Sequence, residues 1–571
     1  MNRSHILKVL LFIAIIVLLS NAVAISRDYQ DSWILEGLEI SFVLFVATYA
    51  LTFFSEKKVS WMVALAVIGG CVFLLIPNLK YVWFQGTAID QHIQYGLANH
   101  VYNEGYIATQ GPFGVSVYGN TPLIHLTFAI FSIVLNIPVV DSFKYIPVFL
   151  CPIYPLATYI IMKKLKFLRG TTALKYALFV SSIPISSEKY VVTGAQFGVL
   201  LTFLILTSLV ILLQKNDRRR WFIFIFFISV LAATHSSSSV LLTVLLLMII
   251  LLQKVSYFRL KSYLKASATF AAISVCVAWL MFPARFTLEA ITRTIFVGVP
   301  SGVTPIAESV PSRFFELARV DMLGAIKSIL VFSGAAVFLS LLTLAGLMIL
   351  LKMRKEVDNT SKFLFLVGGL ILLFVPIGFL LKVGAFRILH LASPLFPIFS
   401  SIFILYVGKR RMWVRGVIFP AIILLATLQL YDCQPLLPSA NVLSNELPTS
   451  EPIVYVNQVN SIYQRQMIEF ARDYVGGRIA GDIVTRNQII GLTEFDFSVA
   501  HLEYYYPLDK NQLERKYDCF LIHLPGASGR FGEQAEMRTR DLILETIYNS
   551  SITYTNGESY ILVHNFTQQY D

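Results

Sequence analysis

Residues 86–107 read GTAIDQHIQYGLANHVYNEGYI and follow an apolar run over 59–79 that is long enough to cross a membrane. Helical spacing in the stretch puts Asp90 and Gln94 on one stripe, beside an apolar stripe. Its acidic and histidine side chains are Asp90, His92, His100 and Glu104. An amphipathic helix lying on the membrane would place Asp90 at the mouth of whatever cavity the spans form. The alternative is a solvated loop with ordinary polar residues.

The composition is that of an integral membrane protein. Of 571 residues, 56% are hydrophobic and 14% are charged, whereas soluble domains are about a quarter charged. The net charge of +12 comes from short basic clusters between apolar runs, the pattern of cytoplasmic loops under the positive-inside rule. The charge therefore reports topology, and we expect no nucleic-acid partner. The five cysteines form no CxxC or metal-spaced pair, which argues against a zinc or redox site.

Apolar runs of about 17–25 residues predict a polytopic all-α membrane protein with about 13 transmembrane helices. The predicted spans are 6–25, 36–54, 59–79, 144–162, 171–187, 192–213, 220–235, 238–252, 266–282, 323–351, 362–381, 388–407 and 414–430. Counting the apolar run at 121–140 as a span would put basic clusters on the outer side. We therefore predict a juxtamembrane or re-entrant helix there, with the N-terminus cytoplasmic. The first run is either a retained span, which we favour, or a signal peptide cleaved after Ala22-Val23-Ala24.

Two domains are predicted. Residues 1–430 form the multi-span membrane domain, with outer loops at 80–143, which carries the juxtamembrane helices, and at 283–322. Residues 431–571 form a small C-terminal extracytoplasmic α/β domain, because charges and turn residues appear there and apolar runs shorten. Strands are predicted at 453–456, 478–484 and 518–524 and as a hairpin over 551–563, with helices at 461–475 and 533–548.

Further charged and polar residues fall at the predicted outer ends of the spans. They are Glu188, His235 in the polar run THSSSS, and the group Lys382, Arg387 and His390. A carboxylate can take a proton from an acceptor hydroxyl, and cations can hold a departing phosphate. This combination suits the transfer of a sugar from a lipid phosphate. Simpler roles stay open: a charged turn at Glu188, a hydrogen-bonded turn at His235, and an interfacial arginine at Arg387.

The sequence resembles the GT-C superfamily of membrane glycosyltransferases, over roughly residues 80–215. The resemblance rests on AIDQHIQYGLANHVYNEG after a span, on VYGNTPLIHLTFAIF at 117–131, and on an acidic residue in the next outer turn. In general plan it is similar to oligosaccharyltransferases, protein O-mannosyltransferases and aminoarabinose transferases. The resemblance implies a catalytic carboxylate at Asp90, a second acidic residue at Glu188, and binding of the donor phosphate at Arg387.

We therefore expect an inverting glycosyltransferase that uses a polyprenyl- or dolichyl-phosphate-linked sugar on the extracytoplasmic face. The acceptor would be a lipid-linked glycan or a surface protein. Lys382 and His235 would assist Arg387, and His92, Glu104 and His390 are further candidates. A divalent metal (Mg²⁺ or Mn²⁺) is disfavoured, because Asp90 belongs to no acidic pair. The alternative is a transporter or flippase of a lipid-linked glycan, which would need polar residues at mid-membrane or two related halves.

Overall fold

The computed structural model describes residues 3–27, 32–80, 89–107, 121–165, 171–183, 194–214, 217–252, 266–283, 338–353, 358–380 and 393–410, with residues 421 and 470 and five short strands. The chain divides into two compact units, which are treated separately here. Unit 1 comprises Met1–Lys80, Asn120–Leu123 and Lys144–Leu436, and unit 2 comprises Tyr81–Gly119, Ile124–Phe143 and Leu437–Asp571.

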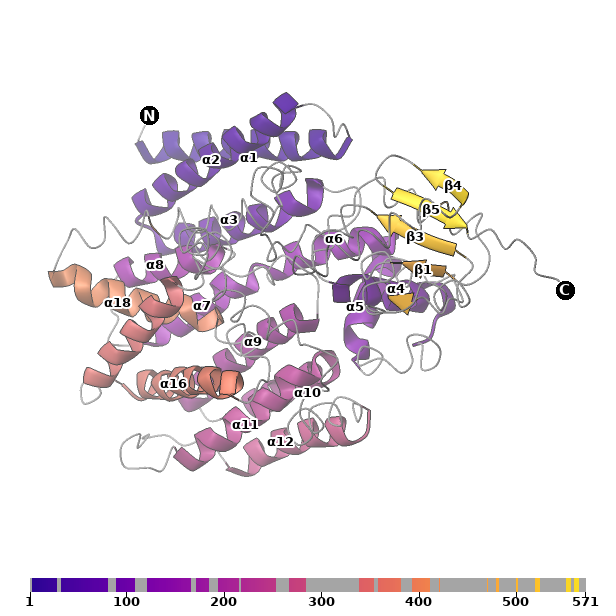
Figure 1. The fold of residues 1–571 in the computed structure, drawn as a ribbon. Coiled ribbons are helices and arrows are strands. Elements are labelled where there is room, and N and C mark those ends of the chain that lie inside the picture. The colour runs from indigo at the N-terminus through magenta and orange to yellow at the C-terminus, as the bar shows by residue number, and fades with distance from the viewer. Residues whose placement is uncertain are drawn as a thin grey trace, which may run out of the picture. The chain divides into compact units, whose positions relative to one another are not determined.

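Unit 1 is a bundle of apolar helices (Figure 1). They are α1 (Arg3–Arg27), α2 (Ser32–Ser55), α3 (Val59–Lys80), α7 (Ile153–Lys164), α8 (Thr171–Ser182), α9 (Gly194–Gln214), α10 (Arg218–Thr234), α11 (Ser236–Leu252), α12 (Ala266–Met281), the helix Phe338–Lys352, α16 (Asn359–Leu380), and the 3-10 turn η3 (Ser393–Leu395), which leads into α18 (Phe396–Arg410). Each predicted span from 6–25 to 388–407 contains a described helix. The span predicted at 414–430 lies outside the described residues, apart from residue 421.

Four of the described helical segments are long and apolar enough to cross a membrane, one of them formed by α6 (Val139–Leu150) and α7 together. They are His5–Ala24, Val59–Ile76, Val139–Lys164 and Gln196–Leu213. Large apolar side chains such as Phe12, Phe222 and Met348 are exposed on the helix surfaces, as expected where lipid replaces water. The protein is therefore embedded in a membrane, and the full number of crossings stays a prediction.

The predicted span at 144–162 lies within the span-length segment Val139–Lys164, which contains a turn near its middle. Helix α6 (Val139–Leu150) ends at a turn formed by Cys151 and Pro152, and α7 begins directly after it. Because Pro152 has no N–H, the Val148 carbonyl lacks its usual partner four residues ahead. The thiol of Cys71 on α3 donates to that carbonyl at 3.6 Å. A Cβ built on Gly70 would lie 2.6 Å from the Cys151 sulfur, so glycine allows the break to pack closely against α3.

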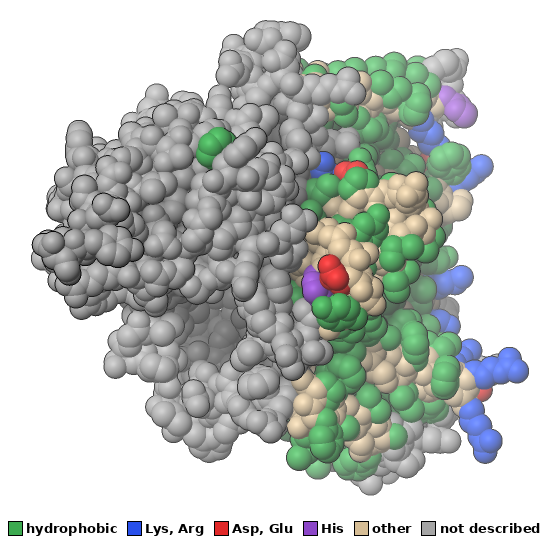
Figure 2. Space-filling model, turned by 90° about the vertical axis from the view of Figure 1, so that its right-hand side faces the viewer, with side chains coloured by type: hydrophobic (Ala, Val, Ile, Leu, Met, Phe, Trp, Pro, Cys, Tyr) green, Lys and Arg blue, Asp and Glu red, His purple; other side chains and the backbone are tan. Residues whose placement is uncertain are grey.

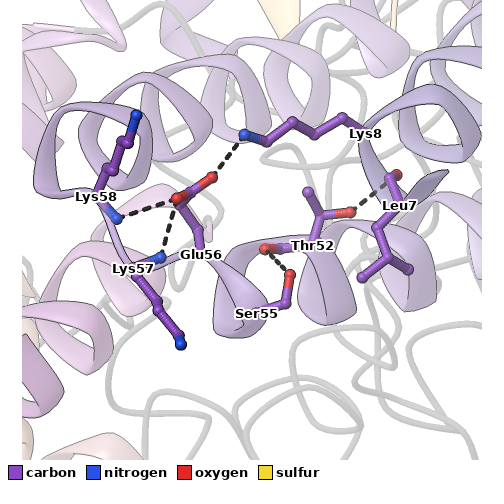
Figure 3. A network of polar contacts seen from close by, with 7 residues as sticks. All are labelled: Leu7, Lys8, Thr52, Ser55, Glu56, Lys57 and Lys58. Carbon is purple, nitrogen blue, oxygen red and sulfur yellow. Dashed lines mark hydrogen bonds and ion pairs between the residues drawn. The ribbon is translucent and has the colours of Figure 1, made fainter. Parts of the chain in front are cut away.

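A polar network joins the beginning of α1 to the turn between α2 and α3 (Figure 3). Lys8 Nζ lies 2.6 Å from Oε2 of the buried Glu56, and it stands 4.2 Å from the centre of the Trp61 ring. The backbone N–H groups of Lys57 and Lys58 both donate to Glu56 Oε1. Burial acts to raise the pKa of Glu56, but the hydrogen bonds from Lys8 and the two N–H groups bring it below its usual value.

The basic ends of several helices lie together in unit 1. Lys175 of α8 donates to the Phe54 carbonyl at the end of α2, and Lys and Arg side chains gather along one edge of the described surface in Figure 2. Helix α3 starts at Val59, shortly after Phe54 in the chain, and therefore at the same edge as Lys175. Helix α7 ends at Lys164, shortly before α8 begins at the same edge, so α7 runs toward it. The chain therefore leaves unit 1 at the end of α3 and returns to it in α6 on the same side, opposite the basic edge. This favours a helix at 121–140 that does not cross the membrane, since one more crossing between them would bring the chain back on the other side.

Unit 2 contains α4 (Ile89–Glu104) and most of α5 (Pro122–Leu135). Helix α4 stops because Gly105 adopts a left-handed backbone with a φ of 75°. Helix α5 starts on a proline, whose missing N–H costs nothing in a first turn, and it ends before Asn136, whose φ is 52°. With 14 residues it is about 21 Å long, shorter than the hydrocarbon core.

The C-terminal part of unit 2 forms a five-stranded sheet. Its strands are β1 (Ile479–Gly481), β2 (Ala500–His501), β3 (Cys519–His523), β4 (Ser551–Thr555) and β5 (Ser559–Val563), in the order β2-β1-β3-β5-β4 (Figure 1). Strand β1 is parallel to β2 and β3, whereas β5 is antiparallel to β3 and β4. Strands β1 and β3 and the pair β4–β5 lie within the stretches predicted at 478–484, 518–524 and 551–563. The strand at 453–456 and, except for residue 470, the helices at 461–475 and 533–548 lie outside the described residues.

Candidate functional site

Asp90 lies in the first turn of α4, as the sequence predicts. The next residues on the same side of the helix, at intervals of three or four, are Gln94, Leu97, Ala98 and Val101, and all are buried. The exposed Asn103 lies on the opposite side of the helix, and the exposed Tyr102 lies beside the stripe. The backbone therefore places Asp90 at the beginning of the buried stripe of α4, one turn before Gln94.

Aromatic rings fix the rotation of α4 within unit 2. The ring of Tyr95 meets Phe143 edge-on, with the ring centres 5.7 Å apart. Phe143, at the beginning of α6, stacks on Phe128 of α5 at 4.0 Å. Turning α4 about its axis would break the contact of Tyr95, so its buried stripe is held in one direction.

The polar residues of α4 do not form one cluster. Glu104 is the last residue of the helix and is exposed. It lies 14 residues after Asp90, which corresponds to about 21 Å along the axis. His92 shares the first turn with Asp90, whereas the ring of His100 packs against Tyr106 at 4.9 Å. Within the described part of the chain, no three His, Cys, Asp or Glu side chains are grouped as metal ligands would be. The prediction of a metal-free site is not tested by this.

His235 joins α10 to α11 at the edge of α9. Its Nδ1 lies 2.6 Å from the hydroxyl oxygen of Ser238 and accepts the Ser238 backbone N–H at 3.3 Å. An accepting Nδ1 means that the neutral ring carries its proton on Nε2. A Cβ built on Gly198 of α9 would lie 2.8 Å from Nδ1, so only glycine fits there without displacing the ring. The hydrogen-bonded turn foreseen as an alternative is present, and phosphate binding by His235 stays a prediction.

The other candidates, Glu188, Lys382, Arg387 and His390, lie outside the described residues. Glu188 stands between the described parts of α8 and α9. The three basic residues stand between α16 and η3, and both of these elements pack against α9. The segment with Glu188 therefore leads directly into α9, and the segment with the three basic residues connects two elements that pack against α9.

Gln94 is the feature of α4 that sequence reasoning left without a role. Its side chain is 2% exposed, and within the described residues no group donates to its Oε1. The one signal available in the sequence was its position four residues after Asp90.

Comparison with known proteins identifies the fold. No protein-family model and no curated protein matches the sequence. An oligosaccharyltransferase of Archaeoglobus fulgidus, solved with Zn and sulfate, matches with a TM-score of 0.52 at 10% identity, covering 88% of this chain and 73% of that one. Its apo form gives 0.50 at 11% identity, covering 89% and 74%.

The arabinofuranosyltransferase AftD from Mycobacteria also matches, with a TM-score of 0.50 at 12% identity. The match covers 89% of this chain and 40% of AftD, so the chain spans less than half of that enzyme. The matched enzymes are GT-C glycosyltransferases. The chain therefore has the fold of the GT-C membrane glycosyltransferases.

Proposed function

We propose that the protein is a membrane glycosyltransferase that moves a sugar from a lipid-phosphate donor to an acceptor on the extracytoplasmic face. The observation that carries the proposal is the fold, which extends over most of the chain and is shared with an oligosaccharyltransferase and an arabinofuranosyltransferase. The position of Asp90 supports it, because a carboxylate in the first turn of a helix that follows a span matches the sequence resemblance.

The basic edge of unit 1 supports the orientation. Cytoplasmic ends of spans are rich in Lys and Arg. Helix α3 begins at this edge and ends at Lys80 on the far side, and the chain continues from there toward α4. The far side is then extracytoplasmic, where a polyprenyl- or dolichyl-phosphate sugar would be presented.

The proposed reaction is a direct displacement. Asp90 accepts the proton of an acceptor hydroxyl, and the oxygen attacks the anomeric carbon of the donor sugar. The bond between that carbon and the phosphate oxygen breaks with inversion, and the lipid phosphate leaves with the bonding electrons. Arg387, assisted by Lys382, neutralises the phosphate, since cations held at the site of developing charge lower the barrier, and His235 assists by donating a hydrogen bond. Glu188 is the second acidic group.

The test is sugar transfer by the purified full-length protein in lipid nanodiscs, with labelled polyprenyl-phosphate sugars and a panel of glycan and peptide acceptors. Asp90→Asn and Arg387→Ala should each reduce transfer at least a hundredfold. Asp217→Asn is the control, because this carboxylate caps α10 at the basic edge, where it accepts from the Arg219 N–H.

Two outcomes would redirect the proposal. Full activity of Asp90→Asn would remove this residue from the mechanism. Movement of a lipid-linked glycan across proteoliposomes, without transfer from any donor, would support the transporter alternative. The acceptor panel separates lipid-linked glycans from surface proteins as acceptors.

A further inference from the structure

The beginning of α10 carries two exposed arginines directly beside exposed apolar side chains. Arg218 and Arg219 are both exposed, at the basic edge of unit 1. The apolar side chains that follow, Phe222, Ile223 and Phe226, are 72%, 47% and 55% exposed. Residues three or four apart are neighbours on a helix surface, so these five side chains form one continuous strip, called the α10 strip below.

The packing of α10 keeps this strip turned outward. Trp221, Phe224 and Ile228 lie on the opposite side of the helix and are buried. The rings of Trp221 and Phe224 meet edge-on, with their centres 5.5 Å apart. Helix α10 packs against α9 and α12, so the strip faces away from the helix bundle. The predicted span at 220–235 puts the arginines at the level of the lipid headgroups and the apolar residues in the hydrocarbon.

Both guanidinium groups are available for an external partner. Another cation of the same edge, Lys175, is engaged, since it donates to the Phe54 carbonyl at 2.9 Å. Among the described residues, no hydrogen bond or ion pair reaches the guanidinium group of Arg218 or of Arg219. The neighbouring Asp217 carboxylate accepts the backbone N–H of Arg219 and caps the helix. The arginines therefore leave two positive charges at the surface.

The two halves of the strip together define the chemistry of a ligand. A guanidinium group is weakly hydrated and can grip a phosphate through two parallel N–H···O bonds. Exposed apolar side chains gain from covering by a hydrocarbon chain. A free phosphate ion would leave Phe222 and Phe226 uncovered, and a lipid without net charge would leave the cations unneutralised. An anionic phospholipid supplies both parts in the order in which the strip presents them.

We propose that the α10 strip binds an anionic phospholipid from the leaflet at the basic edge. The lipid phosphate lies between Arg218 and Arg219, and one acyl chain runs along Phe222 and Phe226. The strip lies at the basic edge, whereas the chain continues from α3 toward α4 on the opposite side. This inference is therefore independent of the proposed function.

The experiment measures lipid binding to the full-length protein by native mass spectrometry in detergent. Phosphatidylglycerol and phosphatidylcholine with the same acyl chains are titrated separately. We expect wild type to bind phosphatidylglycerol about tenfold more tightly. Arg218→Gln combined with Arg219→Gln should reduce this preference to about twofold or less. Phe222→Ala combined with Phe226→Ala should weaken the binding of both lipids about threefold or more and keep the preference.

A matched control removes two other exposed cations from the same edge. Lys57 and Lys58 are both exposed, and the exposed ring nearest to them in the sequence, Trp61, already lies 4.2 Å from the Lys8 ammonium group. Lys57→Gln combined with Lys58→Gln should therefore leave the preference for phosphatidylglycerol unchanged.

A second pair of substitutions tests the guanidinium groups themselves. Arg218→Lys combined with Arg219→Lys keeps both charges but loses the paired N–H donors. Its preference should lie between those of wild type and the glutamine variant. This comparison also remains informative if the glutamine variant does not fold.

Four outcomes would overturn the site. They are equal affinities of wild type for the two lipids, an equal loss of preference in the Lys57 and Lys58 control, unchanged lipid binding in the phenylalanine variant, and competition by inorganic phosphate at the same concentration as phosphatidylglycerol. The last result would identify a simple anion site, because the acyl chain would then contribute nothing to binding.

Discussion

Removing the ammonium group of Lys8 should destabilise the fold through Glu56. In Lys8→Met, the carboxylate stays buried and loses its cation, while the N–H groups of Lys57 and Lys58 still hold Oε1. At 2.6 Å and an effective dielectric constant of about 20, the attraction between the two charges is about 6 kcal/mol before desolvation is subtracted.

The net effect is smaller, and the structure sets its range. Breaking a fully buried pair costs about 3–5 kcal/mol, whereas an exposed pair contributes about 1 kcal/mol or less. The Glu56 side chain is 7% exposed and that of Lys8 is 25% exposed, which places this pair between the two. We expect Lys8→Met to lower the free energy of unfolding by about 2 kcal/mol, including the lost contact of Lys8 with Trp61.

A double-mutant cycle isolates the pair. The free energy of unfolding is measured by titration with denaturing detergent for wild type, Lys8→Met, Glu56→Gln and the double variant. The coupling energy should be about 1–2 kcal/mol. A coupling energy near zero would refute the reasoning, because the contact would then be a surface pair without energetic effect.

The pH dependence of stability gives an independent check on Glu56. Its pKa in the folded protein lies below its usual value of 4.5, so the folded state favours the ionised form. The resulting stabilisation is fully present above about pH 5 and is lost as the pH falls through the folded pKa. Wild type should lose stability over that acidic range more steeply than Glu56→Gln. Equal slopes would contradict the assignment.

Three further predictions concern the site and the packing. Asp90→Asn should abolish transfer while Glu104→Gln retains it, because Glu104 lies at the other end of α4; a transfer assay with both variants checks this. Gly346→Ala should lower the free energy of unfolding by about 2–3 kcal/mol, since a Cβ there would collide with the Phe399 carbonyl. Gly369→Ala should be neutral or stabilising, because no described atom lies within 4 Å of a Cβ at that position. Unfolding in denaturing detergent measures both variants. EDTA should leave the initial rate of transfer unchanged, and a loss restored by added Mn²⁺ or Mg²⁺ would reverse the expectation of a metal-free reaction.

Features that depend on local sequence could be predicted. The apolar runs locate the helices of unit 1, because a span must be long and apolar whatever it packs against. The helix at Asp90 follows from the spacing of its apolar residues, and the β4–β5 pair follows from the turn residues at Asn556 and Gly557. The resemblance to GT-C enzymes likewise rests on local patterns, chief among them the acidic helix that follows α3.

Features that depend on contacts between distant residues could not be predicted. Lys8 looks like the basic flank of a signal peptide, and its pairing with Glu56 appears only when α1 packs against α2. The run 144–162 looks continuous because Pro152 is apolar, and the break is visible only in the backbone. Gln94 is buried because the contact of the Tyr95 ring with Phe143 fixes the rotation of α4, and these two residues are far apart in the sequence. The very short β2 carries too few residues for an alternating pattern to show.

The break between α6 and α7 affects how the protein responds to bilayer thickness. Each of these helices has 12 residues and a length of about 18 Å, so neither alone crosses the hydrocarbon core. A rigid span accommodates a thinner bilayer by tilting as a whole. At Cys151–Pro152 the Cys151 N–H still donates to the Pro147 carbonyl and the Tyr154 N–H to the Cys151 carbonyl, but the Val148 carbonyl receives only a thiol, so the angle between the two helices can change there. Hydrophobic mismatch would therefore be absorbed within this one helix pair, and the neighbouring α3 could keep its inclination in membranes of different thickness.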